Sequence, residues 1–315
     1  MAKHWTEADI PDLAGKTALV TGANTGLGFH EALQLAKHGA HVLVAARNQE
    51  KGQAAVERMR TQVPADRVEL VGLDLADLDS VHALATELTG RLAGLDLLIN
   101  NAGVMAVPQR RTTKQGFELQ FGTNHLGHFA LTGLLLPLLL ARPGSRVVTL
   151  SSAMHRMGRL DIDDLQSERK YGANSTYAAS KLANAVFTVE LNRRFEAAGS
   201  GVLSVGAHPG YSSTDLQYSG PRLGGGGLSA WLLGVATPIL GQPAAQGALP
   251  ALRAAVDPQV TGADYYGPHA LREWRGYPVK VSYIKPAYSA RLGTELWDAS
   301  VRLTSVDYAA LSTVS

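Results

Sequence analysis

Short apolar runs alternate with helical segments through the first two thirds of the chain. The apolar runs cover residues 16–22, 41–47, 67–74, 95–103, 145–152 and 201–210. Continuous apolar strands separated by amphipathic helices indicate a parallel sheet with both faces covered. We therefore predict an α/β fold with one Rossmann-type, doubly wound parallel sheet of about seven strands flanked by helices.

No linker-like break divides the 315 residues, so we expect a single domain. Its core should cover residues 15–267, with a long helical region at about 114–142 and a C-terminal extension at about 268–315. The segment 212–245 combines a glycine-rich run with apolar residues such as Leu223, Leu228 and Leu232. This pattern favours a C-terminal substrate lid, and an irregular connection with a short buried helix is the alternative.

Composition excludes several classes of function. The formal charge of +2 has no basic block, so we expect no nucleic-acid partner. Cysteine is absent, and the histidines lack metal-ligand spacing, so we expect no metal site. The apolar stretch 130–141 is too short to span a bilayer, so we expect no integral membrane segment. Residues 1–16 lack the apolar core of a signal peptide, and we expect a cytoplasmic protein.

The first strand leads into the glycine-rich turn "TGANTGLG", residues 21–28. Gly22, Gly26 and Gly28 allow the backbone to approach a pyrophosphate, and the helix that follows offers unpaired N–H groups to the anion. Because the turn joins a strand to a helix in a βαβ unit, it predicts a dinucleotide site.

The end of the second strand bears on the choice of cofactor. An acidic residue there accepts the ribose 2′-hydroxyl of NAD, whereas an arginine accommodates the 2′-phosphate of NADP. Ala46 occupies the acidic position and Arg47 follows it. This favours NADP(H) over NAD(H), with an ordinary surface arginine as the alternative.

Tyr177 and Lys181 lie four residues apart in "YAASK". On a helix this spacing places both side chains on one face. The pair alone is weak evidence, because a surface helix can carry it by chance.

Seven motifs in order resemble the short-chain dehydrogenase/reductase family, in its single-domain form, over most of residues 15–267. They are "TGANTGLG", "GLDLAD", "NNAG", "TNHLGHF", "LSS", "YAASK" and "HPG". Within that family, the segment from "SSAMHRMGRL" to "YAASKLANAVF" and the later "YYGP" look similar to retinol-dehydrogenase-like and WW-domain-oxidoreductase-like members.

The resemblance implies four catalytic residues: Asn124, Ser152, Tyr177 and Lys181. Tyr177 would be the general acid/base. Lys181 and an oxidised nicotinamide would lower its pKa from the ordinary value near 10. Ser152 would polarise the substrate oxygen, with Ser151 as the alternative, and Asn124 would hold a water or cap a helix irregularity.

The resemblance also implies the cofactor and substrate contacts. The expected cofactor-binding residues are Gly22, Asn24, Thr25, Gly26, Leu27, Gly28, Arg47, Asp74, Leu75, Asn101, Ala102, Gly103, Tyr177, Lys181, Pro209, Gly210, Ser212 and Thr214. The expected substrate contacts are His155, Tyr211, Leu216 and Trp231. Ser212 departs from the family, which usually has an aliphatic residue there.

These features together predict an NADP(H)-dependent oxidoreductase that interconverts a lipophilic alcohol and its aldehyde or ketone. A regulatory NADP(H) sensor without turnover is one alternative, and a C=C reductase is another. The related light-dependent protochlorophyllide reductases use a cysteine that this chain lacks. The resemblance also suggests a homo-oligomer, a dimer or tetramer through the helices that hold Asn124 and Tyr177.

Overall fold

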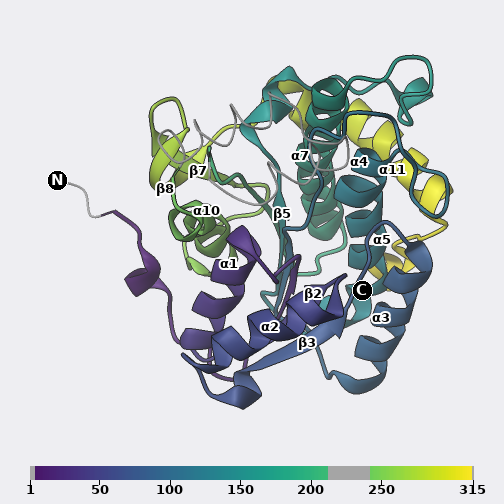
Figure 1. Ribbon diagram of the computed structural model, residues 1–315. Helices are drawn as coiled ribbons and strands as arrows, with labels where there is room; N and C mark the ends of the chain where they lie inside the picture. Colours follow the sequence, from purple (N-terminus) through teal and green to yellow (C-terminus); the bar gives the residue numbers. More distant parts are fainter. Residues whose placement is uncertain (1–3, 212–241, 314–315) are drawn as a thin grey trace.

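The computed structural model describes residues 4–211 and 242–313. Its described residues build one sheet in the order β3-β2-β1-β4-β5-β6-β7-β8 (Figure 1). The strands are β1 Thr17–Thr21, β2 His41–Ala46, β3 Val68–Gly72, β4 Leu97–Asn100, β5 Arg146–Leu150, β6 Leu203–Ala207, β7 Tyr265–Ala270 and β8 Arg275–Val281. This order confirms the Rossmann-type, doubly wound sheet.

The sheet has eight strands in place of the expected seven or so. Strands β1 to β7 are parallel, and β8 pairs with β7 in the antiparallel sense. A four-residue turn joins β7 to β8, and a connection that short permits only antiparallel pairing. The boundary expected between residues 267 and 268 therefore falls inside β7.

Helices cover both faces of the sheet. They are α1 Gly26–Lys37, α2 Gln49–Arg60, α3 Leu78–Arg91, α4 Leu119–Phe121, α5 Gly127–Leu134, α6 Leu136–Leu140, α7 Ala173–Ala197, α10 Ala244–Val256 and α11 Ala290–Thr304. Short 3-10 turns cover Glu7–Asp9, Ala65–Arg67, Ala153–Met157, Ile162–Asp164, Lys285–Tyr288 and Ala309–Thr313, and a π-helical turn covers Gly122–Leu126.

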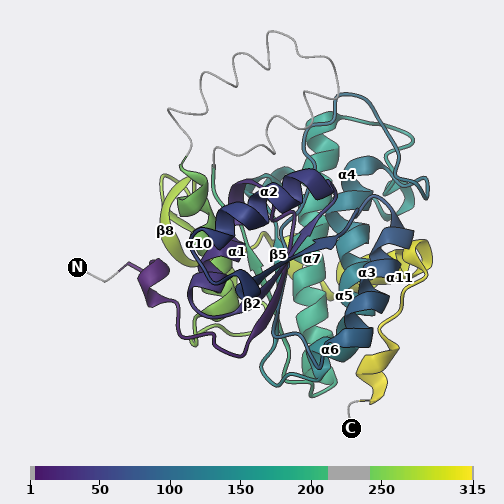
Figure 2. The ribbon, with the colours of Figure 1, turned by 60° about the horizontal axis from the view of Figure 1, so that its bottom comes forward.

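Alternate side chains of the central strands pack into two hydrophobic cores, one on each face of the sheet. In β2, Val42 and Val44 pack with residues of α1, α2 and α10, whereas Leu43 and Ala45 pack with residues of α3, α5 and α7. Figure 2 shows these two helical layers on opposite sides of the sheet. Burial on both faces explains why the strands read as continuous apolar runs.

The helical region expected at residues 114–142 begins later and is interrupted. Glu118 caps α4, because its carboxylate accepts hydrogen bonds from the backbone N–H groups of Gln120 and Phe121. The π-helical turn follows at once, and α6 begins anew beside Pro137. Proline fits the first turn of a helix but not its interior, which accounts for the second break.

Most of the expected lid, residues 212–241, lies outside the described residues. Of the remainder, Gln242 and Pro243 lead into α10, which begins at Ala244 and packs against α1. Within residues 4–211 and 242–313, no helix combines the length and the apolar character needed to cross a bilayer.

Candidate active site

The ends of four strands bring the predicted site residues to one edge of the sheet. Strand β1 pairs with β2 on one side and β4 on the other, so the strand order reverses there. A crevice forms outside the carboxyl ends of parallel strands at such a point. The glycine-rich turn follows β1, "NAG" follows β4, Ser152 follows β5 and His208 follows β6.

The glycine-rich turn has the backbone geometry of a phosphate cradle. Gly22 and Gly26 have φ angles of 66° and 57°, a region that L side chains rarely adopt. A Cβ on Gly28 would lie 2.5 Å from the Asn101 amide nitrogen and 2.8 Å from the Gly22 carbonyl oxygen. Because α1 begins at Gly26, its first N–H groups face this turn, and the cradle suits a dinucleotide pyrophosphate.

A hydrogen-bond network that the sequence did not indicate holds the segment after β4. The Thr21 hydroxyl accepts from the backbone N–H groups of Asn101 and Ala102, each at 2.9 Å. It also lies 2.9 Å from Nε2 of His128, whose Nδ1 lies 3.0 Å from the Asn124 carbonyl oxygen. Burial lowers the pKa of His128 to about 4, so the ring is neutral. Nδ1 then donates to Asn124 and Nε2 accepts from Thr21.

The Asn124 side chain is fully engaged inside the π-helical turn. Its Oδ1 accepts from Val104 N at 2.8 Å, and its Nδ2 donates to Val104 O at 3.0 Å and to Ser180 Oγ at 2.9 Å. Asn124 thus joins the loop after β4 to α7. Of the two roles expected for it, the structure displays the polar residue at a helix irregularity, and the water-holding role stays a prediction.

The two serines after β5 have different surroundings. The buried Ser151 hydroxyl donates to the Lys181 carbonyl oxygen at 2.8 Å, which ties β5 to α7. The Ser152 hydroxyl accepts from Met154 N at 3.2 Å and lies near enough to Tyr177 to lower the pKa of the phenol. Because the Ser151 hydroxyl is bonded to the backbone of α7, Ser152 stays the serine predicted to meet a substrate oxygen beside Tyr177.

Tyr177 and Lys181 lie on one face of α7, and both are buried, with 4% and 3% of their surface exposed. The Lys181 ammonium lies 5.8 Å from the centre of the Tyr177 ring and donates to the Leu150 carbonyl oxygen at 3.0 Å. A Cβ on Gly103 would lie 3.0 Å from Asn124 Oδ1 and 3.7 Å from Lys181 Nζ. Asn124 and Lys181 thus meet beside Gly103, and Tyr177 lies next to Lys181 and Ser152.

The pKa of Tyr177 moves against the expected direction. Burial raises it to about 12, and the nearby Ser152 hydroxyl opposes that shift only in part. Burial also lowers the pKa of Lys181 to about 8. A low-polarity site disfavours the charged form of both groups, so Lys181 does not by itself produce a phenolate.

Further residues on the cofactor side lie along the same edge. Arg47 is exposed after β2, next to the buried Ala46, and no described residue forms an ion pair with it. The Asp74 carboxylate accepts from Ala76 N at 2.9 Å and shapes the turn after β3. With the glycine cradle, these residues fit a nicotinamide dinucleotide laid across the carboxyl edge.

The predicted substrate contacts are only partly described. The predicted substrate contacts Leu216 and Trp231 lie outside the described residues, as do the predicted cofactor contacts Ser212 and Thr214. The Tyr211 ring packs at 5.7 Å from that of Trp274. The His155 ring is fully buried, with its edge toward Tyr265 at 5.5 Å, so its contact with substrate stays a prediction.

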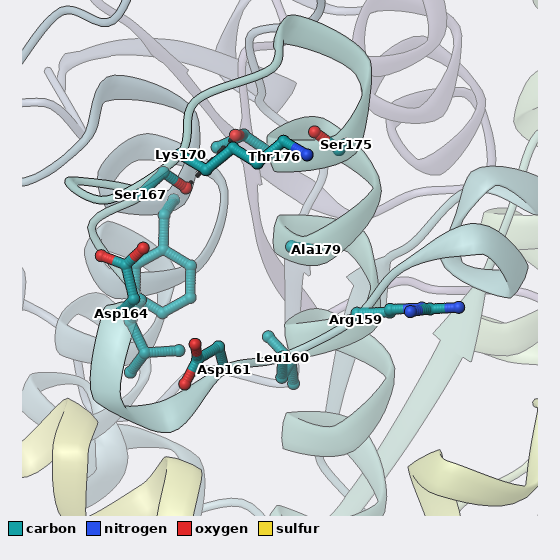
Figure 3. A pocket seen from close by; sticks show the side chains of 11 residues that line it. Arg159, Leu160, Asp161, Asp164, Ser167, Lys170, Ser175, Thr176 and Ala179 are labelled. Atoms are coloured by element: carbon teal, nitrogen blue, oxygen red, sulfur yellow. Dashed lines mark hydrogen bonds between the residues drawn. The ribbon is translucent and has the colours of Figure 1, made fainter.

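A separate hollow of about 210 Å³ lies beside the first turns of α7 (Figure 3). Its lining includes the carboxylates of Asp161 and Asp164 and the side chains of Arg159 and Lys170. None of the four predicted catalytic residues lines it.

Comparison with known proteins agrees with this geometry. The short chain dehydrogenase family model matches residues 16–221, more than half of the chain. Human retinol dehydrogenase 13 is 47% identical over 212 residues, which cover 67% of this chain and 62% of the relative. The match thus spans less than two thirds of that relative's length. Human polyprenol dehydrogenase is 38% identical over 307 residues, 95% of this chain and 88% of the relative.

Solved structures share the fold of this chain. An uncharacterized protein from Mycobacterium paratuberculosis superposes with a TM-score of 0.80 at 41% identity, over 97% of this chain and 99% of that one. A protein assigned as an NAD(P) dependent gluconate 5-dehydrogenase from Beutenbergia cavernae, with bound NADP, gives a TM-score of 0.60 at 27% identity, over 78% and 91% of the two chains. Family model, relatives and sheet-edge geometry agree: this chain belongs to the short-chain dehydrogenase family.

Proposed function

We propose that this protein is an NADP(H)-dependent oxidoreductase that interconverts an alcohol and its aldehyde or ketone. The observation that carries the proposal is the meeting of Ser152, Tyr177 and Lys181 at the sheet edge that also holds the glycine cradle. A sensor without turnover would not need a proton donor, a polarising hydroxyl and an ammonium in one buried place.

The chain's own residues supply the proton chemistry. Bound cofactor would supply or accept the hydride. The Tyr177 phenol, neutral at neutral pH, holds the proton that a carbonyl oxygen takes up on reduction, and the Ser152 hydroxyl donates a hydrogen bond to the same oxygen. Lys181, charged below its pKa of about 8, stabilises the phenolate that remains. The burial of Tyr177 and Lys181 keeps bulk water from both groups.

A lipophilic substrate is the second part of the proposal. The relatives are named as dehydrogenases of retinol and of polyprenol, both long isoprenoid alcohols. The polyprenol dehydrogenase match extends over nearly the whole chain, so it includes the C-terminal segments in which substrate contacts are expected. An isoprenoid or similarly apolar alcohol is therefore the substrate class that we propose.

The preference for NADP(H) rests on Arg47. Its guanidinium follows β2, and the neighbouring Ala46 presents no carboxylate that would repel a 2′-phosphate. The bound NADP in the structural relative from Beutenbergia cavernae supports the same choice.

The test is a titration of wild-type protein and of Arg47→Asp with NADPH and with NADH, in which binding is measured by the fluorescence of the cofactor. We expect wild type to bind NADPH at least about tenfold more tightly than NADH, and Arg47→Asp to lose that preference. Arg302→Asp, an equal charge change on the exposed side of α11, is the control and should behave as wild type. An unchanged preference in Arg47→Asp would exclude this role for Arg47.

A further inference from the structure

The turn between β7 and β8 carries a carboxylate that connects three segments of the sheet edge. Glu273 Oε2 lies 2.9 Å from His208 Nε2, at the end of β6. Its Oε1 accepts from Arg156 Nη2 at 2.7 Å, in the 3-10 turn that follows Ser152. The turn belongs to the β7–β8 hairpin, at the edge of the sheet in Figure 1.

The hydrogen bonds around His208 set its tautomer. His208 is almost fully buried, and burial lowers its pKa, so the ring is neutral. Its Nδ1 accepts from the Gly210 backbone N–H at 3.3 Å, so the ring proton lies on Nε2, which donates to Glu273. The carboxylate therefore fixes the imidazole, and the imidazole holds the Gly210 backbone.

The same turn makes a second contact with this loop. The Trp274 carbonyl oxygen accepts from the Tyr211 N–H at 2.8 Å and lies so close to Gly210 that a Cβ there would clash with it. Gly210 has a φ of 66°. Residues 208–211 are thus shaped by the side chain of Glu273 and by the backbone of Trp274.

Gln242 also connects the loop 208–211 to the β7–β8 hairpin. Its side chain donates to Pro209 O at 2.7 Å and accepts from Gly276 N at 3.0 Å. Its backbone N–H donates to Tyr211 O at 2.9 Å. His208, Pro209 and Tyr211 therefore each have a hydrogen bond to the hairpin or to Gln242, and Gly210 is bonded to His208.

The hairpin turn has an unfavourable backbone conformation. Leu271, Arg272 and Glu273 have φ angles of 51°, 55° and 68°, and none of them is glycine. Left-handed backbone is unfavourable for residues with a Cβ, so other contacts must offset it. The contacts of Glu273 and Trp274 with residues 156 and 208–211 are among those that the structure offers, beside the turn's own backbone hydrogen bonds.

We propose that Glu273 is a positioning residue that holds the loop 208–211 in the shape that binds the nicotinamide end of the cofactor. It acts through His208 on the Gly210 backbone, and through Arg156 it ties this loop to the segment that carries Ser152. The inference rests on the proposed function, because it needs a dinucleotide at the sheet edge.

The test compares NADPH dissociation constants and steady-state kinetics of Glu273→Ala, Glu273→Gln and the wild-type protein. Glu273→Ala should raise the dissociation constant and the KM for NADPH about tenfold, since a hydrogen-bonded charge is lost, with kcat changed less than threefold. Glu273→Gln keeps an acceptor for His208 and should recover affinity to within about threefold of wild type. Arg272→Ala, an exposed neighbour in the same turn, is the matched control and should stay within about twofold.

The outcomes separate the two proposals. NADPH affinity in Glu273→Ala equal to that of wild type would overturn the positioning role and leave the proposed function intact. Equal losses in Glu273→Ala and Arg272→Ala would also overturn it, because the turn as a whole would then be responsible. Wild-type protein that does not bind NADPH would refute the proposed function itself.

If Glu273→Ala fails to fold, Arg156→Ala removes one of the two contacts of Glu273 and should raise the NADPH dissociation constant at least about threefold. Wild-type affinity in that variant would refute the positioning role.

Discussion

Burial decides the protonation of individual side chains in this protein. It raises the pKa of Tyr177, which favours the neutral phenol, and it lowers the pKa of Lys181. The same effect acts on Glu31 of α1, which is completely buried and has no hydrogen-bond partner among the described residues on either carboxylate oxygen. Burial raises the pKa of Glu31 from 4.5 to about 8.

Glu31 should therefore make stability fall with rising pH. The folded-state pKa lies above the unfolded one, so its contribution is fully present below pH 4.5 and is lost as the pH rises to about 8. We expect Glu31→Gln to be more stable than wild type at pH 8, by a few kcal/mol at most, and nearly equal to it at pH 4.5. Urea unfolding at both pH values measures this. Glu50→Gln, on the exposed side of α2, is the control, and a pH-independent difference for Glu31→Gln would contradict the account.

At the scale of elements, the start of α1 is the most constrained part of the site. Its glycines allow the turn to pass close to the segment after β4, and Thr21 and His128 hold that segment in place. A side chain at Gly28 would need Asn101 and Gly22 to move.

We expect Gly28→Ala to lower NADPH affinity by about tenfold or more and to destabilise the fold by about 1–3 kcal/mol, because the Cβ overpacks this contact. Gly90→Ala is the matched control, since a Cβ at Gly90 in α3 meets no atom within 4 Å. It should leave affinity unchanged and raise stability by up to about 1 kcal/mol. NADPH titration and urea unfolding of both variants provide the check. Equal affinity of the two variants would show that the cradle is not at Gly28.

At the scale of the whole molecule, the C-terminal part of the chain completes the helical layer. Trp297 of α11 stacks on Phe187 of α7 at 6.1 Å, and the Tyr308 hydroxyl donates to the Phe129 carbonyl oxygen at 2.8 Å. Part of the face formed by α5 and α7 is thus covered by the chain itself. An oligomer through these helices stays a prediction.

Local patterns predicted the parts of the fold that depend on neighbouring residues. The six apolar runs became β1 to β6, and the motif residues after them gathered at one edge because parallel strands end on the same side. Strand β8 was missed although Tyr277, Val279 and Val281 alternate in "RGYPVKV", because Pro278 argues against a central strand and is tolerated here only at the sheet edge.

Contacts between distant segments could not be predicted in this way. Glu273 meets His208 across 65 positions and Arg156 across 117. The pKa of Tyr177 depends on how deeply α7 packs, which no spacing reveals. The π-helical turn at Asn124 likewise follows from its pairing with Val104 and Ser180 and not from helix propensity.

The central claim is that Tyr177 transfers the proton in carbonyl reduction. The most direct measurement is NADPH oxidation with retinoid, polyprenyl and simple aldehydes and ketones, by wild type, Tyr177→Phe and the control Tyr171→Phe, each saturated with NADPH. Tyr171 hydrogen-bonds to Val107 O, away from Ser152, so its variant should stay active. We predict that Tyr177→Phe binds NADPH as wild type does and loses at least about 10²-fold in rate. Tyr177→Phe that reduces the same carbonyl at the wild-type rate would contradict the account.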